Sequence, residues 1–238
     1  MKTYQQLIEG VYDPNIFKAF FMAGGPGSGK SYAAGKTTAG QGLKVVNSDD
    51  VFEKYLKTAK LSFEMPATQA AKRDARRSAA KVVTSRRQAN YIEGRLGMVI
   101  DGTGKDFGKI LTQATSLRNI GYDVYMIFVN TSLEVALERN KKRDRHVPEK
   151  HVIDSWKDVQ GNIGKFQQVF GAKNFIIVDN NNADDKIFDE VSKKVRGLLN
   201  RKVNNFIAKA WIEKELRLHK RWENRKDYDR RKRLSAND

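Results

Sequence analysis

One segment of the sequence has the composition and spacing of a phosphate-binding loop. Residues 24–31 read GGPGSGKS and fit G-x-x-x-x-G-K-[ST], directly after a short apolar run and at the start of a helical pattern. In such a loop backbone N–H groups point at phosphate oxygens, the lysine reaches the β- and γ-phosphates, and the hydroxyl ligates Mg²⁺. A plain glycine turn is the alternative. The pattern predicts that a nucleoside triphosphate binds to Gly24, Gly25, Pro26, Gly27, Ser28, Gly29, Lys30 and Ser31.

Two adjacent carboxylates follow the next apolar run. Transfer of a phosphoryl group to a hydroxyl needs a base near the γ-phosphate. Asp49 and Asp50 supply two candidates. Asp50 also fits a helix N-cap with Glu53 as its capping-box partner, so Asp49 is the better candidate base. A capping or turn role for the whole pair is the alternative.

Positive charge and a third carboxylate complete the candidate chemistry. Arg139 and Arg143 lie four residues apart on one face of a predicted helix, where they would place positive charge beside the migrating phosphoryl group, although a solvated basic face is the alternative. Asp101 ends an apolar run, where its carboxylate would enter the Mg²⁺ shell or bind the acceptor. Its alternative role is to cap a turn.

These residues need a scaffold that brings strand ends together. Short β-rich runs occupy residues 19–23, 43–47, 98–101, 124–130 and 175–179, and helical patterns occupy residues 31–39, 51–58, 68–95, 107–119, 133–143 and 149–160. This alternation predicts an α/β fold of the P-loop NTPase type, a parallel sheet sandwiched by helices. Ligands of such sheets bind at the carboxyl ends of the strands.

The domain prediction divides the chain into a kinase-like domain, 1–200, and a basic helical C-terminal extension, 201–238. The extension is expected to be helical to about residue 233, with one narrow apolar face. That face comprises Val203, Ile207, Trp211, Leu218 and Trp222.

The surplus of positive charge is confined to two segments. The 238 residues carry 45 Lys and Arg against 28 Asp and Glu, a net charge of +17. Residues 54–95 contribute +8 (11 basic, 3 acidic) and residues 201–238 contribute +7 (13 basic, 6 acidic). Such surfaces favour polyanionic partners.

The remaining composition excludes some classes of protein. There is no cysteine, which excludes disulfide scaffolds and thiolate zinc sites, and the three histidines argue against a histidine-rich metal site. No run is long enough to span a membrane, and we expect a soluble, cytoplasmic protein with no membrane partner.

The basic helical pattern at residues 68–95 bears on the acceptor. Ala71, Ala75, Ala79 and Val82 are expected to pack on the core, which would turn the basic residues outward. On this basis we expect Arg73 and Arg77 to bind acceptor phosphates of DNA or RNA. A solvated helix face is the alternative.

The four motifs, in this order, resemble the P-loop kinase group that includes zeta toxins and the kinase domain of phage polynucleotide kinase. The polynucleotide-kinase pattern implies Asp49 as base, whereas the zeta-toxin pattern implies Asp50. The zeta-toxin pattern also implies that Asp101, Thr103 and Lys105 contact the acceptor. The lid of polynucleotide kinase resembles residues 139–148 and implies that Arg139 and Arg143 bind donor phosphates.

The chain departs from both acceptor patterns. Phe52 replaces the arginine that in polynucleotide kinase contacts the acceptor phosphate, and Ser85 is the nearest match to a glutamate of zeta toxins. We therefore expect an ATP- and Mg²⁺-dependent kinase of a hydroxyl, most readily on nucleic acid, with a nucleotide sugar such as UDP-N-acetylglucosamine as the second candidate. A nucleic-acid-binding ATPase is the third reading, and Gly102 after Asp101 disfavours a motor, which would have a hydrolytic glutamate there.

Overall fold

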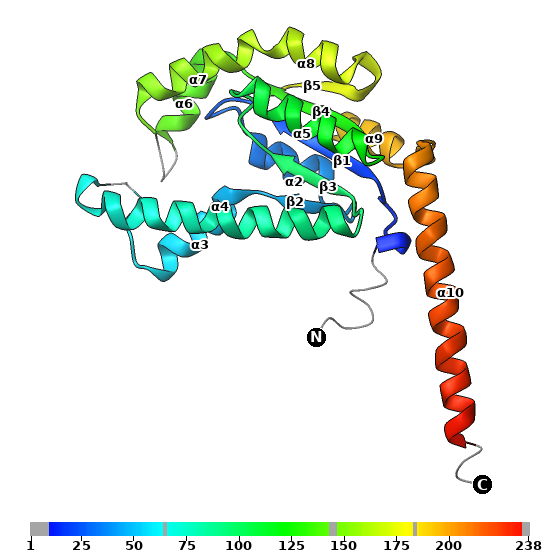
Figure 1. Ribbon diagram of the computed structural model, residues 1–238. Coiled ribbons are helices and arrows are strands. Elements are labelled where there is room, and N and C mark those ends of the chain that lie inside the picture. The colour runs from blue at the N-terminus through cyan, green and yellow to red at the C-terminus, as the bar shows by residue number, and fades with distance from the viewer. Residues whose placement is uncertain (1–9, 64–65, 143–146, 183–184, 235–238) are drawn as a thin grey trace.

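A computed structural model of the chain describes residues 10–63, 66–142, 147–182 and 185–234, without the side chains of residues 67 and 228–234. Its centre is a five-stranded parallel sheet with the order β2-β3-β1-β4-β5 (Figure 1). The predicted α/β fold is confirmed. The strands are β1 (Lys18–Ala23), β2 (Lys44–Val46), β3 (Met98–Asp101), β4 (Asp123–Asn130) and β5 (Phe175–Asp179).

The helices connect and extend these strands. In chain order they are α2 (Lys30–Thr38), α3 (Ser48–Thr58), α4 (Ala70–Glu93), α5 (Phe107–Asn119), α6 (Leu133–Lys141), α7 (Glu149–Gly161), α8 (Ile163–Phe170), α9 (Asp185–Leu199) and α10 (Phe206–Leu234). Short 3₁₀ turns, η1 (Ala67–Gln69) and η2 (Ala172–Asn174), precede α4 and β5.

Apolar residues of the three central strands, β1, β3 and β4, alternate between two cores. One core joins residues such as Phe21 and Phe128 to α5 and α8, and the other joins residues such as Phe20 and Ile127 to α2 and α9. Because both faces of the sheet are covered, the strands read in the sequence as continuous apolar runs. The carboxyl edge of the sheet is left for the loops that carry polar residues.

The packing of α4 differs from the expectation for the basic helix. Ala71 and Ala75 are exposed and Val82 is 50% exposed, whereas Ala80 and Thr84 are buried. Ala80 joins Val51, Phe52 and Leu56 of α3 in a small third core. The expected apolar stripe was wrong because α3 presents aromatic and aliphatic side chains to a different face of α4. An alanine side chain offers too little apolar area to determine which face packs.

The C-terminal extension is anchored through the first part of α10. Ala208 is fully buried, and the Trp211 ring meets the Phe17 ring edge-on at 5.6 Å. Of the expected apolar face, Val203 and Trp211 pack on the core, whereas Ile207, Leu218 and Trp222 are 36%, 46% and 41% exposed. In the part of the chain that the structure describes, no helix is long and apolar enough to cross a membrane.

Candidate active site

The phosphate loop joins β1 to α2, as predicted. Gly24, Gly27 and Gly29 have φ angles of 153°, 80° and 82°, which only glycine adopts without strain. Gly29 precedes α2 without a side-chain cap, which leaves the first N–H groups of the helix available to an anion. Lys30 Nζ donates a hydrogen bond to the Gly24 carbonyl at 2.7 Å, so the ammonium folds back over the loop. This is an arrangement that can bind phosphates.

A group of carboxylates lies at the ends of β2 and β3. The two strands are neighbours, with Val46 opposite Ile100, and this register brings Asn47 next to Asp101. Asn47 Nδ2 donates to Asp101 Oδ2 at 3.0 Å and to Asp50 Oδ1 at 3.1 Å. Its Oδ1 accepts the Asp49 N–H at 2.8 Å. One amide therefore connects both strand ends to the start of α3.

The cap of α3 differs from the expected one. The helix begins at Ser48 and its N-cap is Asn47, not Asp50. The capping box of Asp50 and Glu53 was wrong because the strand ends at Val46 and the chain enters the helix at once. Neither Asp49 nor Asp50 is the N-cap of α3, and both lie in its first turn.

The electrostatics couple these carboxylates to the phosphate loop. Burial raises the pKa of Asp101, the Lys30 ammonium lowers it, and the charges of Asp49 and Asp50 raise it. Burial also raises the pKa of Asp50, with a further increase from Asp49 and an opposing effect of Lys54. Asp101 thus lies within electrostatic reach of Lys30 on one side and of Asp49 and Asp50 on the other, so it links the phosphate loop to the candidate bases.

The opposite side of the phosphate loop is formed by α6 and the end of β5. Arg139 Nη2 donates to the Asn181 carbonyl at 3.2 Å, and a Cβ added to Gly29 would lie 3.8 Å from Arg139 Nη1. Asn180 Nδ2 donates to the Ser28 carbonyl at 2.7 Å. Arg143 lies outside the described residues. Sequence reasoning missed Asn180, although its place directly after a predicted strand was a usable signal.

Buried polar atoms without hydrogen-bond partners concentrate around this loop. Among the described residues, four of the five such side-chain atoms are Ser28 Oγ, Asp101 Oδ1, Arg139 Nη1 and Asn180 Oδ1. Buried polar atoms are normally paired, so an unpaired group indicates a site for a ligand, ion or water. Their position at the loop supports binding of a polar ligand there.

Thr103 and Lys105 follow β3 and were expected to contact the acceptor, but they differ in their position relative to the phosphate loop. The Thr103 carbonyl accepts the Gly24 N–H at 3.0 Å, which holds this residue beside the phosphate loop. The Lys105 ammonium forms an ion pair with Asp158 of α7 at 3.2 Å, with both side chains about half exposed. Thr103 is thus close to the site, whereas the Lys105 side chain is directed to α7.

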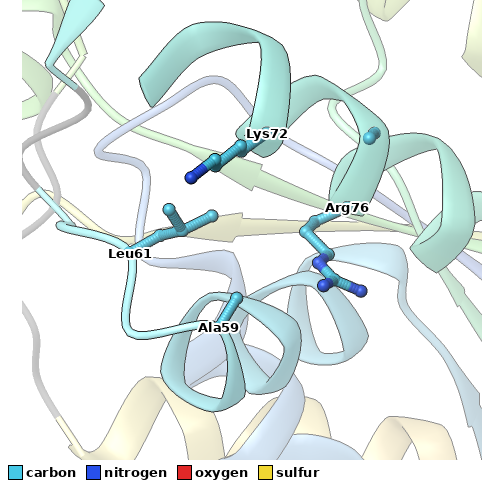
Figure 2. A pocket seen from close by; sticks show the side chains of 5 residues that line it. Ala59, Leu61, Lys72 and Arg76 are labelled. Carbon is cyan, nitrogen blue, oxygen red and sulfur yellow. The ribbon is translucent and has the colours of Figure 1, made fainter. Parts of the chain in front are cut away.

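The basic residues of α4 fall into two groups. Arg73 donates to the Pro66 carbonyl at 3.2 Å, and the Arg77 guanidinium lies 4.4 Å from the centre of the Phe52 ring. Lys72 and Arg76 are exposed and line a pocket of about 430 Å³ between α3 and α4, shown in Figure 2. Ala59, Leu61 and Ala75 provide its apolar lining.

The fold and the site define the class of the protein, an ATP-dependent P-loop kinase. Residues 11–192 match the family described as Zeta toxin, and the chain belongs to this family. No curated protein matches the chain.

Solved structures share the fold at low sequence identity. A candidate kinase from Chloroflexus aurantiacus is 12% identical, with a TM-score of 0.51, and the match covers 77% of this chain and 97% of that chain. The AvrRxo1-ORF1:AvrRxo1-ORF2 complex with sulphate ions is 14% identical, with a TM-score of 0.53 over 84% of this chain and 70% of that chain. The structure of the same complex with ATP is 15% identical, with a TM-score of 0.53, and the match covers 84% of this chain and 69% of that chain.

Proposed function

We propose that the protein transfers the γ-phosphate of ATP to an alcohol hydroxyl of a nucleic acid. The observation that carries the transfer chemistry is the position of Asp101, which is hydrogen-bonded through Asn47 to the start of α3 and lies within electrostatic reach of Lys30, Asp49 and Asp50. Lys30 and Arg139 stabilise the charge of the migrating phosphoryl group, and the resemblance assigns Arg143 the same role.

The reaction needs one proton transfer. Asp49 accepts the proton of the acceptor hydroxyl while that oxygen forms a bond to the γ-phosphorus. The bond from the γ-phosphorus to the bridging oxygen breaks, and ADP leaves with the electron pair. Asp49 is the base that the polynucleotide-kinase pattern implies, and Asp50, which the zeta-toxin pattern implies, is the alternative.

The residues present fit a magnesium ion. Mg²⁺ is usually held by one or two carboxylates together with phosphate oxygens and water. The described residues contain no group of three or more acidic, histidine or cysteine side chains that would hold a metal without substrate. Asp101, with its unpaired buried Oδ1, and the Ser31 hydroxyl are the residues that would hold the ion. Bound there, it would neutralise phosphate charge.

Exposed positive charge along α4 supports a nucleic-acid acceptor. Arg73 and Arg77 rest against α3 and the segment before α4, and their phosphate contacts remain a proposal. Other basic side chains of α4 are exposed and can reach the phosphates of an acceptor more readily than Arg73 and Arg77. These are Lys72, Arg76, Lys81, Arg86 and Arg87. A helix of 24 residues is roughly 36 Å long, a length that suits a polymer.

A nucleotide sugar is the second candidate acceptor. The family match favours it, because the chain belongs to the Zeta toxin family and the zeta-toxin resemblance implies a nucleotide-sugar acceptor. The inward contacts of Arg73 and Arg77 favour it as well, since they reduce the basic surface offered to a polymer. Lys72 and Arg76 would then bind the diphosphate of a small acceptor.

The acceptor is tested by incubating the protein with γ-labelled ATP and a panel of hydroxyl compounds. The panel contains hydroxyl-ended DNA and RNA oligonucleotides, nucleosides and UDP-N-acetylglucosamine. We expect label on an oligonucleotide, lost in Lys30→Ala and retained in Lys36→Ala, whose lysine pairs with Asp185 away from the loop. Label on the sugar nucleotide alone would support the second candidate. Phosphate release with no labelled acceptor would contradict both.

A further inference from the structure

The C-terminal helix α10 has an anchored part and an unanchored part. In the anchored part, Ala208 is buried, a Cβ on Gly121 would touch Ala208, and the Trp211 ring packs against Phe17. The last described ring contact of this part is His219 against Tyr12, at 5.8 Å. The helix is therefore fixed to the amino-terminal segment and to the turn before β4.

Beyond His219 the helix leaves the body of the domain. All described side chains from Lys220 to Asp227 are exposed. The helix continues to Leu234, and 15 further residues correspond to roughly 22 Å of helix. Figure 1 shows this part of α10 running away from the sheet and its covering helices. We call residues 220–234 the distal arm.

The distal arm is strongly basic. It contains eight lysines and arginines against three acidic residues. Lys220 and Arg221 share one helix face with Arg217 one turn earlier, which is ion-paired with Glu213. Arg225 lies one turn after Arg221, at the edge of that face nearest the side of Trp211. Trp211 and His219, which anchor the helix, lie on the other side at the same periodicity. The positive charge is thus directed to solvent.

We propose that the distal arm is a docking surface for nucleic acid, separate from the kinase centre. A nucleic acid backbone carries regularly spaced negative charges, and its binding through lysines and arginines releases counterions. A second copy of this chain fits less well, since two arms of the same charge repel each other. A lipid surface fits less well because a membrane-surface helix needs a broad apolar face. Apart from Trp222, Tyr228 and Leu234, the arm has no large apolar residue.

The arm extends the proposed function, because it would hold a polymeric acceptor beside the kinase domain. Only the statement that the bound nucleic acid is the phosphoryl acceptor rests on the proposed function. Binding to the arm requires neither ATP nor Lys30. A failure of the kinase proposal can therefore be distinguished from a failure of the docking proposal.

The test compares two triple variants of the full chain with equal net charge. The first is Lys220→Glu/Arg221→Glu/Arg225→Glu on the distal arm. The matched control is Lys193→Glu/Lys194→Glu/Arg196→Glu, which changes three exposed basic residues of α9. Affinity for labelled duplex DNA and labelled single strands of about 20 nucleotides is measured without ATP by fluorescence anisotropy over a range of salt concentrations.

We expect the arm variant to bind at least about tenfold more weakly and to reduce the magnitude of the log–log salt slope by roughly two to three. The α9 control should stay near the unmodified protein in both quantities. Phosphorylation of a mononucleoside or sugar nucleotide, where it occurs, should be equal in the two variants.

Equal loss of DNA affinity in both variants would overturn the proposal, because the effect would then follow net charge alone. Unchanged affinity of the arm variant would overturn it too. Binding of vesicles containing phosphatidylserine, lost in the arm variant while DNA binding persists, would replace nucleic acid by a lipid surface. A change of mass in solution only in the arm variant, with DNA binding intact, would indicate a contact between copies.

Discussion

The side-chain amide of Asn47 donates a hydrogen bond to Asp101 at 3.0 Å and thereby connects the ends of two neighbouring strands. The same amide nitrogen donates to Asp50 at 3.1 Å, and the amide oxygen caps α3. Asn47 thus holds the strand-end carboxylate and the first turn of α3 in a fixed relationship. A candidate base and a candidate magnesium ligand are positioned by a residue with no charge of its own.

Replacement of Asn47 should separate its two roles. Asn47→Ser retains a good helix cap but removes the amide donors, whereas Asn47→Ala removes both and should cost about 1 kcal/mol of stability. In both variants kcat should fall roughly tenfold or more. The acidic limb of the pH–rate profile should move to higher pH, because Asp101, which would hold Mg²⁺ in its ionised form, loses a donor to that form. A purely structural role would lower the melting temperature of Asn47→Ala and leave the profile of Asn47→Ser in place.

The two carboxylates of α3 can be distinguished by amide replacement. Asp49→Asn should reduce kcat by roughly 10²–10⁴, the usual contribution of a general base. Asp50→Asn should reduce it much less, and KM for ATP should change little in either variant. Single-turnover assays would provide the comparison. The reverse order of effects would assign the base to Asp50.

Asp101 should lower the stability of the fold at neutral pH. Burial raises its pKa above the ordinary value of 3.8. The unfolded chain therefore releases this proton at lower pH than the folded protein, and stability is lost as pH rises through the folded pKa. Asp101→Asn should raise the melting temperature at about pH 7.5 while reducing kcat, and the gain should shrink toward pH 4. Calorimetry over this range checks the sign, and a gain that grows toward low pH would contradict it.

Two glycines of the loop and its helix should respond oppositely to alanine. A Cβ on Gly27 would collide with the backbone of Ala136, and its φ of 80° is unfavourable for any other residue, so Gly27→Ala should abolish ATP binding. Gly35, inside α2, has open space around its Cβ position. Gly35→Ala should stabilise the protein by about 0.5–1 kcal/mol. Calorimetric titration with ATP and thermal unfolding test the pair, and nucleotide binding by Gly27→Ala would contradict the loop geometry.

Most of the fold follows from local patterns. The five strands are within one residue of the predicted ends, and α5 has its predicted bounds, because short apolar runs and caps are local signals. The last helical pattern predicted before β5 ended at about residue 160, so the region 163–170, which contains Gly164, was not predicted as a helix. In the structure α8 forms there because Phe166 and Phe170 are buried against the sheet. Tertiary burial outweighed the low helix propensity of glycine.

The site was predictable only where one segment carries it. The phosphate loop is such a segment, because its glycines, Lys30 and Ser31 are adjacent in the chain and form a signal by type and spacing alone. The role of Asn47 was not accessible, since it depends on the pairing of β2 with β3 rather than on its own surroundings in the sequence. The same holds for Asn180, which reaches Ser28 across 152 positions of the chain.

By itself, the sequence determined the phosphate loop, the alternation of strands and helices, and the concentration of positive charge in two segments. These properties depend on residue type and short spacing. Only the tertiary structure decided that Arg77 turns inward to Phe52 while Arg76 faces a pocket, because helix packing selects the face. It also decided which strand ends are neighbours, because strand order and register are set by contacts between segments far apart in the chain.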